Sequence, residues 1–156
     1  METRDYQRLL LAVDFEKESE PVVARAQRLK ALLDARLVLL HVVEHVPPTM
    51  EYMPVGYAGD VTFPENLDLE EELLAIARRE LDVLGERMGV PIADRLVRVG
   101  PTGRTIDEVA SELAIDLVVI GSRGRHGFLG LFGSTARAVL RNSTCDVLCV
   151  KIEETG

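Results

Sequence analysis

The sequence lacks the features of a membrane protein, of a secreted protein and of a general nucleic-acid-binding protein. No apolar run approaches the roughly 20 residues that a membrane-spanning helix needs. Residues 1–5 do not have the layout of a signal peptide. The formal net charge of −8 makes the surface acidic, so that it repels phosphate backbones. We therefore expect a cytoplasmic protein with no membrane insertion and no nucleic-acid partner.

Cysteine is scarce, because the 156 residues contain only Cys145 and Cys149. In a strand this spacing places both side chains on one face but too far apart for an easy disulfide. A metal or redox site would need further ligands or a C-x-x-C pair. We interpret both as small buried hydrophobic residues. The length and the hydrophobic content of 47% are those of one globular domain, residues 1–156.

Apolar runs and helical stripes alternate along the chain. Short apolar runs predict buried strands, and a run of alternating charged and apolar residues predicts a more exposed strand at 93–99. Pro21 suits the first turn of one helix, and Asn66 or Asp68 can cap the next. The buried strands are expected at 8–13, 36–43, 117–120 and 147–152, and the helices near 21–33, 66–88, 106–113 and 134–142. A long proline-rich loop is expected between residues 44 and 64.

This alternation of strands and helices predicts an α/β fold. Five parallel strands with right-handed crossovers form a doubly wound, Rossmann-like sheet with helices on both faces. The three most apolar strands should be central and the strand at 93–99 should lie at an edge. Ligands of such sheets bind beyond the carboxyl ends of the strands, where the winding reverses. Asp14, residues 42–44 and the segment after residue 120 are all expected there.

A glycine-rich segment follows the strand at 117–120. Glycine occurs there at every third position, and residues 117–145 contain four arginines but no Asp or Glu. A glycine-rich turn that leaves a strand and opens a helix is suited to phosphate, because free N–H groups and the helix dipole point at the anion. The segment therefore predicts an anion site; the glycines are Gly121, Gly124, Gly127, Gly130 and Gly133.

The two common phosphate-binding motifs are absent. The segment contains no Lys, which excludes the P-loop signature G-x-x-x-x-G-K-[ST]. The first strand leads into Val13-Asp14-Phe15, which excludes a dinucleotide fingerprint there. The pattern is instead Gly121-x2-Gly124, eight residues, and Gly133-Ser134.

With these residues the chain resembles the universal stress protein family, specifically its bacterial single-domain, UspA-like type. The resemblance extends over nearly the whole length, and the family's ATP-binding members carry G-x2-G-x9-G-[ST], one residue longer in the second gap. It implies an adenine nucleotide alpha hydrolase-like fold, a stress-response role and ATP, ADP or AMP as ligand, with or without Mg²⁺. The matching segments are Leu-Ala-Val-Asp at 11–14, Leu-Leu-His-Val-Val at 39–43, Asp-Leu-Val-Val-Ile-Gly-Ser at 116–122, Gly-Ser-Thr-Ala at 133–136 and Cys-Asp-Val-Leu-Cys-Val at 145–150.

The resemblance also implies roles for individual residues. Asp14 would lie at the adenosine end, Val42 would present main-chain groups to adenine, and Gly121 would lie against the ribose. Gly124 and the helix start at 133–135 would donate N–H groups to the phosphates. Arg123 is added from its charge alone. The candidate nucleotide-binding residues are Ala12, Asp14, Val42, Ile120, Gly121, Arg123, Gly124, Gly133, Ser134 and Thr135.

Purely structural roles are also open for Asp14 and for His41, which is not among these candidates. Asp14 could instead cap the following turn. His41, inside an apolar strand, is more typical of a core histidine with its hydrogen bonds satisfied than of a catalyst. No clear base or metal-binding carboxylate other than Asp14 accompanies the arginines, so at most slow ATP hydrolysis is expected.

Two main functions remain open from the sequence, and an ATPase or other nucleotide-using enzyme is a third, minor option. The chain is either an adenine-nucleotide-binding regulator, or a dimeric interaction protein of the same family that does not bind nucleotide appreciably. In both, the apolar strand at the carboxyl end is expected at a sheet edge, where an unpaired strand invites pairing. Family resemblance implies a homodimer through this strand, Val147–Ile152, and an unidentified protein partner.

Overall fold

A computed structural model describes residues 6–44, 64–122 and 134–152. Five parallel strands form one sheet in the order β3-β2-β1-β4-β5. Their bounds are Arg8–Ala12 for β1, Arg36–Val43 for β2, Arg95–Val99 for β3, Leu117–Gly121 for β4 and Asp146–Val150 for β5. The predicted parallel α/β fold is thus confirmed. As expected, the three most apolar strands are central, and β3 and β5 form the two edges.

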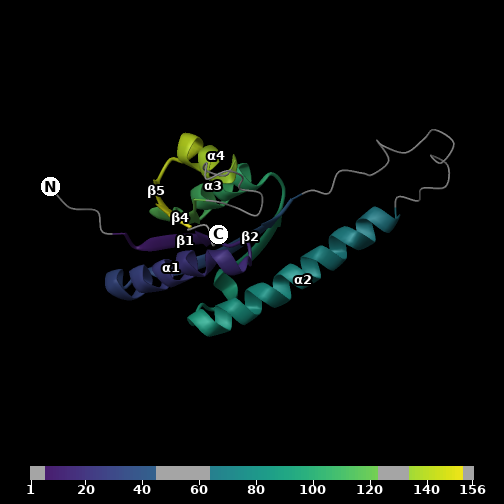
Figure 1. Cartoon of the computed structure of the whole chain (residues 1–156), viewed down its shortest axis with the longest axis horizontal. Coiled ribbons are helices and arrows are strands. Elements are labelled where there is room, and N and C mark those ends of the chain that lie inside the picture. The colour runs from purple at the N-terminus through teal and green to yellow at the C-terminus, as the bar shows by residue number, and fades with distance from the viewer. Residues whose placement is uncertain (1–5, 45–63, 123–133, 153–156) are drawn as a thin grey trace.

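Helices cover both faces of the sheet, as the sequence predicts (Figure 1). Helices α1 (Glu20–Leu33) and α2 (Pro64–Met88) lie on one face, and α3 (Thr102–Glu112) and α4 (Ser134–Asn142) lie on the other. The 25-residue helix α2 extends well beyond the sheet at its N-terminal end (Figure 1).

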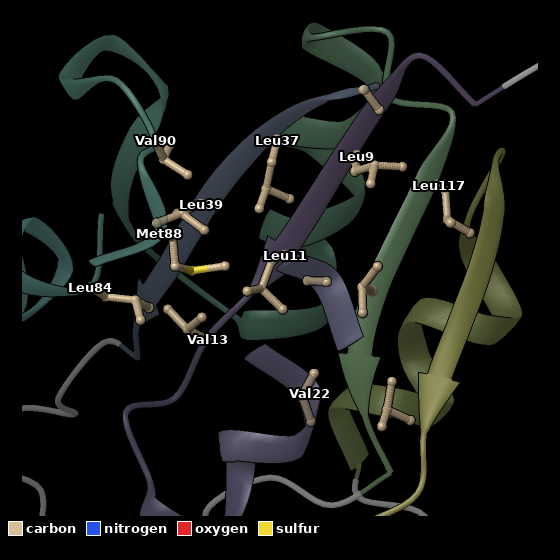
Figure 2. Close-up of a cluster of buried hydrophobic side chains, with 14 of the residues drawn as sticks. Leu9, Leu11, Val13, Val22, Leu37, Leu39, Leu84, Met88, Val90 and Leu117 are labelled. Atoms are coloured by element: carbon tan, nitrogen blue, oxygen red, sulfur yellow. The ribbon is translucent and has the colours of Figure 1, made fainter. Parts of the chain in front are cut away.

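Alternating side chains of the central strands fill two separate cores. Leu9 and Leu11 of β1 face α1 and α2, where they belong to a cluster with Val22 and Met88 (Figure 2). Leu10, between them, points to the opposite face and belongs to a cluster with residues of α3 and α4. Because both faces are covered, every side chain of a central strand can be apolar, which explains the continuous apolar runs.

Some element boundaries differ from the predicted ones. Helix α2 starts at Pro64, ahead of the expected caps Asn66 and Asp68, since proline suits a first helical position. Strand β3 starts at Arg95 because Ile92–Asp94 form a 3-10 turn, η4. That turn buries Asp94, whose carboxylate accepts two hydrogen bonds from the Arg36 guanidinium, at 2.5 and 3.0 Å.

The cysteine interpretation needs a correction. Both cysteines are free and only half-buried, and Cys145 lies just before β5 rather than within it. Both pack against the cluster that α3 and α4 form on their face of the sheet. They behave as small apolar residues at the margin of the core, because β5 is an edge strand that is covered less completely than β1, β2 and β4.

Candidate functional site

The carboxyl ends of β2, β1 and β4 lie side by side and form the edge where the winding of the sheet reverses. From β1 the chain passes to α1 on one face, and from β4 it leads towards α4 on the opposite face. Ligands of open α/β sheets usually bind at such a reversal. Five predicted residues come together here: Ala12, Asp14, Val42, Ile120 and Gly121.

The remaining predicted residues lie in the segment that follows β4 and in the first turn of α4. Ser134 and Thr135 form the start of α4, as predicted, so their main-chain N–H groups lie in the first turn of a helix. Arg123, Gly124 and Gly133 lie outside the described residues. The structure therefore describes seven of the ten predicted residues, five at the strand ends and two at the helix start.

The turn after β1 is held by main-chain and side-chain hydrogen bonds. The Val13 N–H donates to the Leu40 carbonyl at 2.9 Å, which continues the ladder by one bond beyond β1. Oδ1 of Asp14 accepts the N–H of Glu16 at 3.0 Å. Phe15, between them, has φ +62°, a left-handed conformation that costs a non-glycine residue energy. Asp14 thus caps the turn through one oxygen, as one of its two interpretations predicted.

His41 supports the same turn from β2. Its Nδ1 lies 2.7 Å from the Val13 carbonyl oxygen, and its ring lies against that of Phe15 with centroids 4.4 Å apart at 36°. A carbonyl can only accept, so Nδ1 carries the proton. The expectation that His41 is a histidine with a satisfied hydrogen bond is confirmed for Nδ1. Its contact with the turn that carries Asp14 could not be derived from its position in an apolar strand.

A rim of the site is formed by the residues that follow β3, which lie beside the end of β2. The Gly100 N–H donates to the Val43 carbonyl at 3.0 Å, and Gly100 has φ +150°. A Cβ at position 100 would lie 2.8 Å from Oγ1 of Thr105, so glycine is required by both conformation and space. Thr102 Oγ1 donates to a carboxylate oxygen of Glu44 at 3.0 Å, which ties the start of α3 to the end of β2.

A surface cavity of about 850 Å³ opens between α3 and α4 beside this rim. Of the predicted site residues that the structure describes, only Thr135 lines it. Its charged lining consists of Glu44, Arg104, Asp107 and Glu108, so acidic groups outnumber basic ones. This cavity therefore suits a polyphosphate poorly.

Asp107 lines this cavity, and nothing in the sequence indicated that an oxygen of its carboxyl group would be buried. Its Oδ1 is buried and has no hydrogen-bond partner among the described residues. Burial raises the pKa of the Asp107 carboxyl above its usual range, because desolvation penalises the charged form. Asp107 belongs to no motif, so only the packing of the two helices could identify it.

No group of three or more His, Cys, Asp or Glu side chains in the described ranges could hold a metal ion. Among the same residues, no helix is both long and apolar enough to cross a membrane.

Comparisons with known proteins identify a family for this chain. Residues 5–151 match the model of the Universal stress protein family. Universal stress protein A homolog 1 of Coxiella burnetii is 36% identical over 149 residues, covering 96% of this chain and 99% of the relative. Its homolog 2 from the same organism is 34% identical, covering 96% and 97%.

Solved structures give the same result at the level of the fold. UspA from Lactobacillus plantarum superimposes with a TM-score of 0.76 at 21% identity, covering 95% of this chain and 99% of that one. A universal stress protein in complex with cAMP superimposes with a TM-score of 0.61 at 26% identity, covering 96% and 99%.

Proposed function

Because the chain belongs to the universal stress protein family, we propose that it binds an adenine nucleotide at the crevice between the ends of β1, β2 and β4. The ligand is ATP, ADP or AMP. The protein then acts as a regulator or sensor in a stress response, through contacts with a protein partner that depend on the bound nucleotide.

The observation that carries the proposal is the convergence of the predicted residues at the switch point of the sheet. Asp14 and Ala12 reach this edge from β1, Val42 from β2, and Ile120 and Gly121 from β4. Gly121 is half-buried and ends its strand, so a sugar can approach the main chain there without a Cβ in the way. The solved complex of a universal stress protein with cAMP supports an adenine nucleotide as the ligand.

The phosphates are assigned to the start of α4. The nine-residue helix begins at Ser134 and presents its first N–H groups and the positive end of its dipole. Gly124, Gly133 and Arg123 supply the remaining contacts in this proposal. The acidic lining of the neighbouring cavity favours this end of the crevice over the groove between α3 and α4.

Little or slow hydrolysis is proposed. Phosphoryl transfer needs in-line positioning, a cationic clamp and a group that orients the nucleophile. Asp14 is the only carboxylate among the ten predicted site residues, and one of its oxygens caps the turn. A single carboxylate together with substrate phosphates is a common way to hold Mg²⁺. Asp14 is therefore the residue that would hold Mg²⁺ beside the nucleotide.

A homodimer through the C-terminal strand accompanies this function. Strand β5 is an edge of the sheet and pairs only with β4 among the described strands, which leaves one side open to a second copy. The second candidate function, a dimeric interaction protein without appreciable nucleotide binding, rests on this same edge and on the shortened second gap of the glycine pattern.

Titration separates the two functions. Protein stripped of nucleotide is titrated with ATP, ADP, AMP and cAMP by calorimetry, and nucleotide released by heating fresh protein is identified by anion exchange. Binding that is lost in a Gly124→Val, Gly133→Val double variant supports the proposal. A Gly127→Val, Gly130→Val variant is the matched control, since it changes two glycines of the same segment outside the motif. If none of the four nucleotides binds the wild type, the interaction protein is the correct function.

A further inference from the structure

We propose that His41 is a positioning residue that takes over a hydrogen bond of the sheet and thereby leaves the main chain of Val42 open for a ligand. The part of this inference that concerns the ligand rests on the proposed function. The part that concerns the sheet stands on the hydrogen bonds between β1 and β2 alone.

The direction of each main-chain group of β2 follows from two hydrogen bonds. The Leu40 carbonyl accepts from Val13 on the β1 side, and the Val43 carbonyl accepts from Gly100 on the β3 side. The polar groups of successive residues in a strand alternate between its two neighbours. The N–H and C=O of Val42 therefore point to the β1 side, where β1 has already ended at Ala12.

In a continued parallel ladder, the next bond would run from the Val42 N–H to the Val13 carbonyl. Among the described residues the Val42 N–H makes no hydrogen bond to Val13, although the preceding bond of the ladder, from the Val13 N–H to the Leu40 carbonyl, is present. The Val13 carbonyl instead accepts from Nδ1 of His41, at 2.7 Å. The imidazole thus supplies the donor that the ladder would otherwise take from Val42.

The turn after Val13 keeps the chain from returning to β2. Asp14 Oδ1 holds the Glu16 N–H at 3.0 Å, and the left-handed Phe15 packs its ring on that of His41. One imidazole therefore makes two contacts with the turn, a hydrogen bond through Nδ1 and a ring contact with Phe15. Together these contacts keep β1 from extending along Val42.

An open N–H and C=O on one residue form a donor and an acceptor that point in the same direction. They suit a planar ligand edge with an acceptor next to a donor, which adenine offers at N1 and N6. Val42 is itself buried, with 8% of its surface exposed, so a ligand bound to this pair is shielded from water on one side. In this way His41 prepares the adenine contact without touching the nucleotide.

Two substitutions separate the donor from the ring. In His41→Asn the side-chain amide nitrogen lies two bonds from Cβ, as Nδ1 of histidine does. The variant therefore keeps the hydrogen-bond donor and loses the ring. His41→Phe keeps a ring for Phe15 but removes the donor. In His41→Phe the Val13 carbonyl loses its partner, so that the Val42 N–H takes its place and the ladder extends by one bond.

The first measurement is amide hydrogen exchange of Val42 by NMR in the nucleotide-free protein. We expect protection of the Val42 amide to rise about 10-fold or more in His41→Phe and to stay near the wild-type value in His41→Asn. Unchanged protection in His41→Phe, in a variant whose circular dichroism shows a folded protein, would overturn the inference. This result does not depend on whether a nucleotide binds.

The second measurement is ATP affinity by calorimetry. We expect about 10-fold weaker binding for His41→Phe, the effect of one lost hydrogen bond, and affinity within about 3-fold of wild type for His41→Asn. If His41→Asn loses affinity while His41→Phe keeps it, the ring contact and not the donor prepares the site, and the inference is wrong. If the wild type does not bind ATP, the proposed function fails while the exchange result still decides the role of His41.

Discussion

Gly103 of α3 packs directly against Ala138 of α4. A Cβ at position 103 would lie 2.6 Å from the Cβ of Ala138, well inside van der Waals contact. Gly103 is buried, so the contact cannot be relieved into solvent. The absence of a side chain at one position therefore sets how closely α3 approaches α4, the helix whose first turn is assigned to the phosphates.

This contact predicts that Gly103→Ala destabilises the fold by about 1–2 kcal/mol, because the two helices must move apart. Urea unfolding measures the loss. In the Gly103→Ala, Ala138→Gly double variant the space is restored, so the two effects should couple by about 1 kcal/mol in a double-mutant cycle. Additive effects would show that the helices do not meet at this pair.

The buried oxygen of Asp107 predicts a stability that depends on pH. Burial raises the pKa of the Asp107 carboxyl, so the folded state binds this proton more tightly than the unfolded state. Its contribution to stability is full below the unfolded pKa, near pH 4, and is lost as the pH rises through the folded pKa. At pH 7 the Asp107 carboxylate is charged in the unfolded state, and burying that charge lowers the free energy of unfolding.

We therefore expect Asp107→Asn to be more stable than the wild type at pH 7 by about 1 kcal/mol or less, with the difference shrinking towards pH 4. Urea unfolding at the two pH values measures both numbers. Glu108→Gln is a control on the same helix that alters charge without the buried oxygen. A wild type that is more stable than Asp107→Asn at pH 7 would contradict the assignment.

The two proposed roles of Asp14 can be separated by charge. Asn at this position keeps an oxygen that can accept the Glu16 N–H, so Asp14→Asn should change the free energy of unfolding by less than about 0.5 kcal/mol. The same variant lacks the charge for Mg²⁺, and we expect ATP affinity in the presence of Mg²⁺ to fall about 10-fold.

Asp14→Ala provides the comparison, since it removes both the cap and the charge. It should lose about 1 kcal/mol of stability in addition to affinity. Equal ATP affinity for wild type and Asp14→Asn, with and without Mg²⁺, would leave Asp14 with the turn as its only role.

The hydrogen bonds of β5 identify the position that tests the proposed dimer. The Val150 carbonyl accepts the Ser122 N–H at 2.8 Å, so the main chain of Val150 and Leu148 points to β4 and that of Cys149 points to the open edge. Proline at Cys149 removes an outward N–H and spares the ladder with β4.

We expect Cys149→Pro to sediment as a monomer and Cys149→Ala, which loses the same thiol but keeps the N–H, to sediment as a dimer. Circular dichroism of both variants checks that the fold is retained. A Cys149→Pro protein that remains a dimer would exclude pairing through β5.

The order and type of the elements could be predicted from the sequence because each follows from a local pattern. Continuous apolar runs occur where a strand is covered on both faces, as in β1, β2 and β4, and alternation occurs at the edge strand β3. Boundaries were less well predicted. Asp94 belongs to a 3-10 turn because its carboxylate bonds to Arg36, which is 58 residues away in the chain.

From the amino-acid sequence one could infer the parallel α/β fold, the family, and the placement of Asp14, Val42 and Gly121 at neighbouring strand ends, because these depend on hydrophobic period and on motifs within short segments. Three features became evident only in the folded protein: the hydrogen bond of His41 to Val13, the buried Asp107 oxygen that has no partner among the described residues, and the packing of Gly103 against Ala138. Each of these depends on the distance between two elements that are far apart in the chain, and no local pattern of residues encodes such a distance.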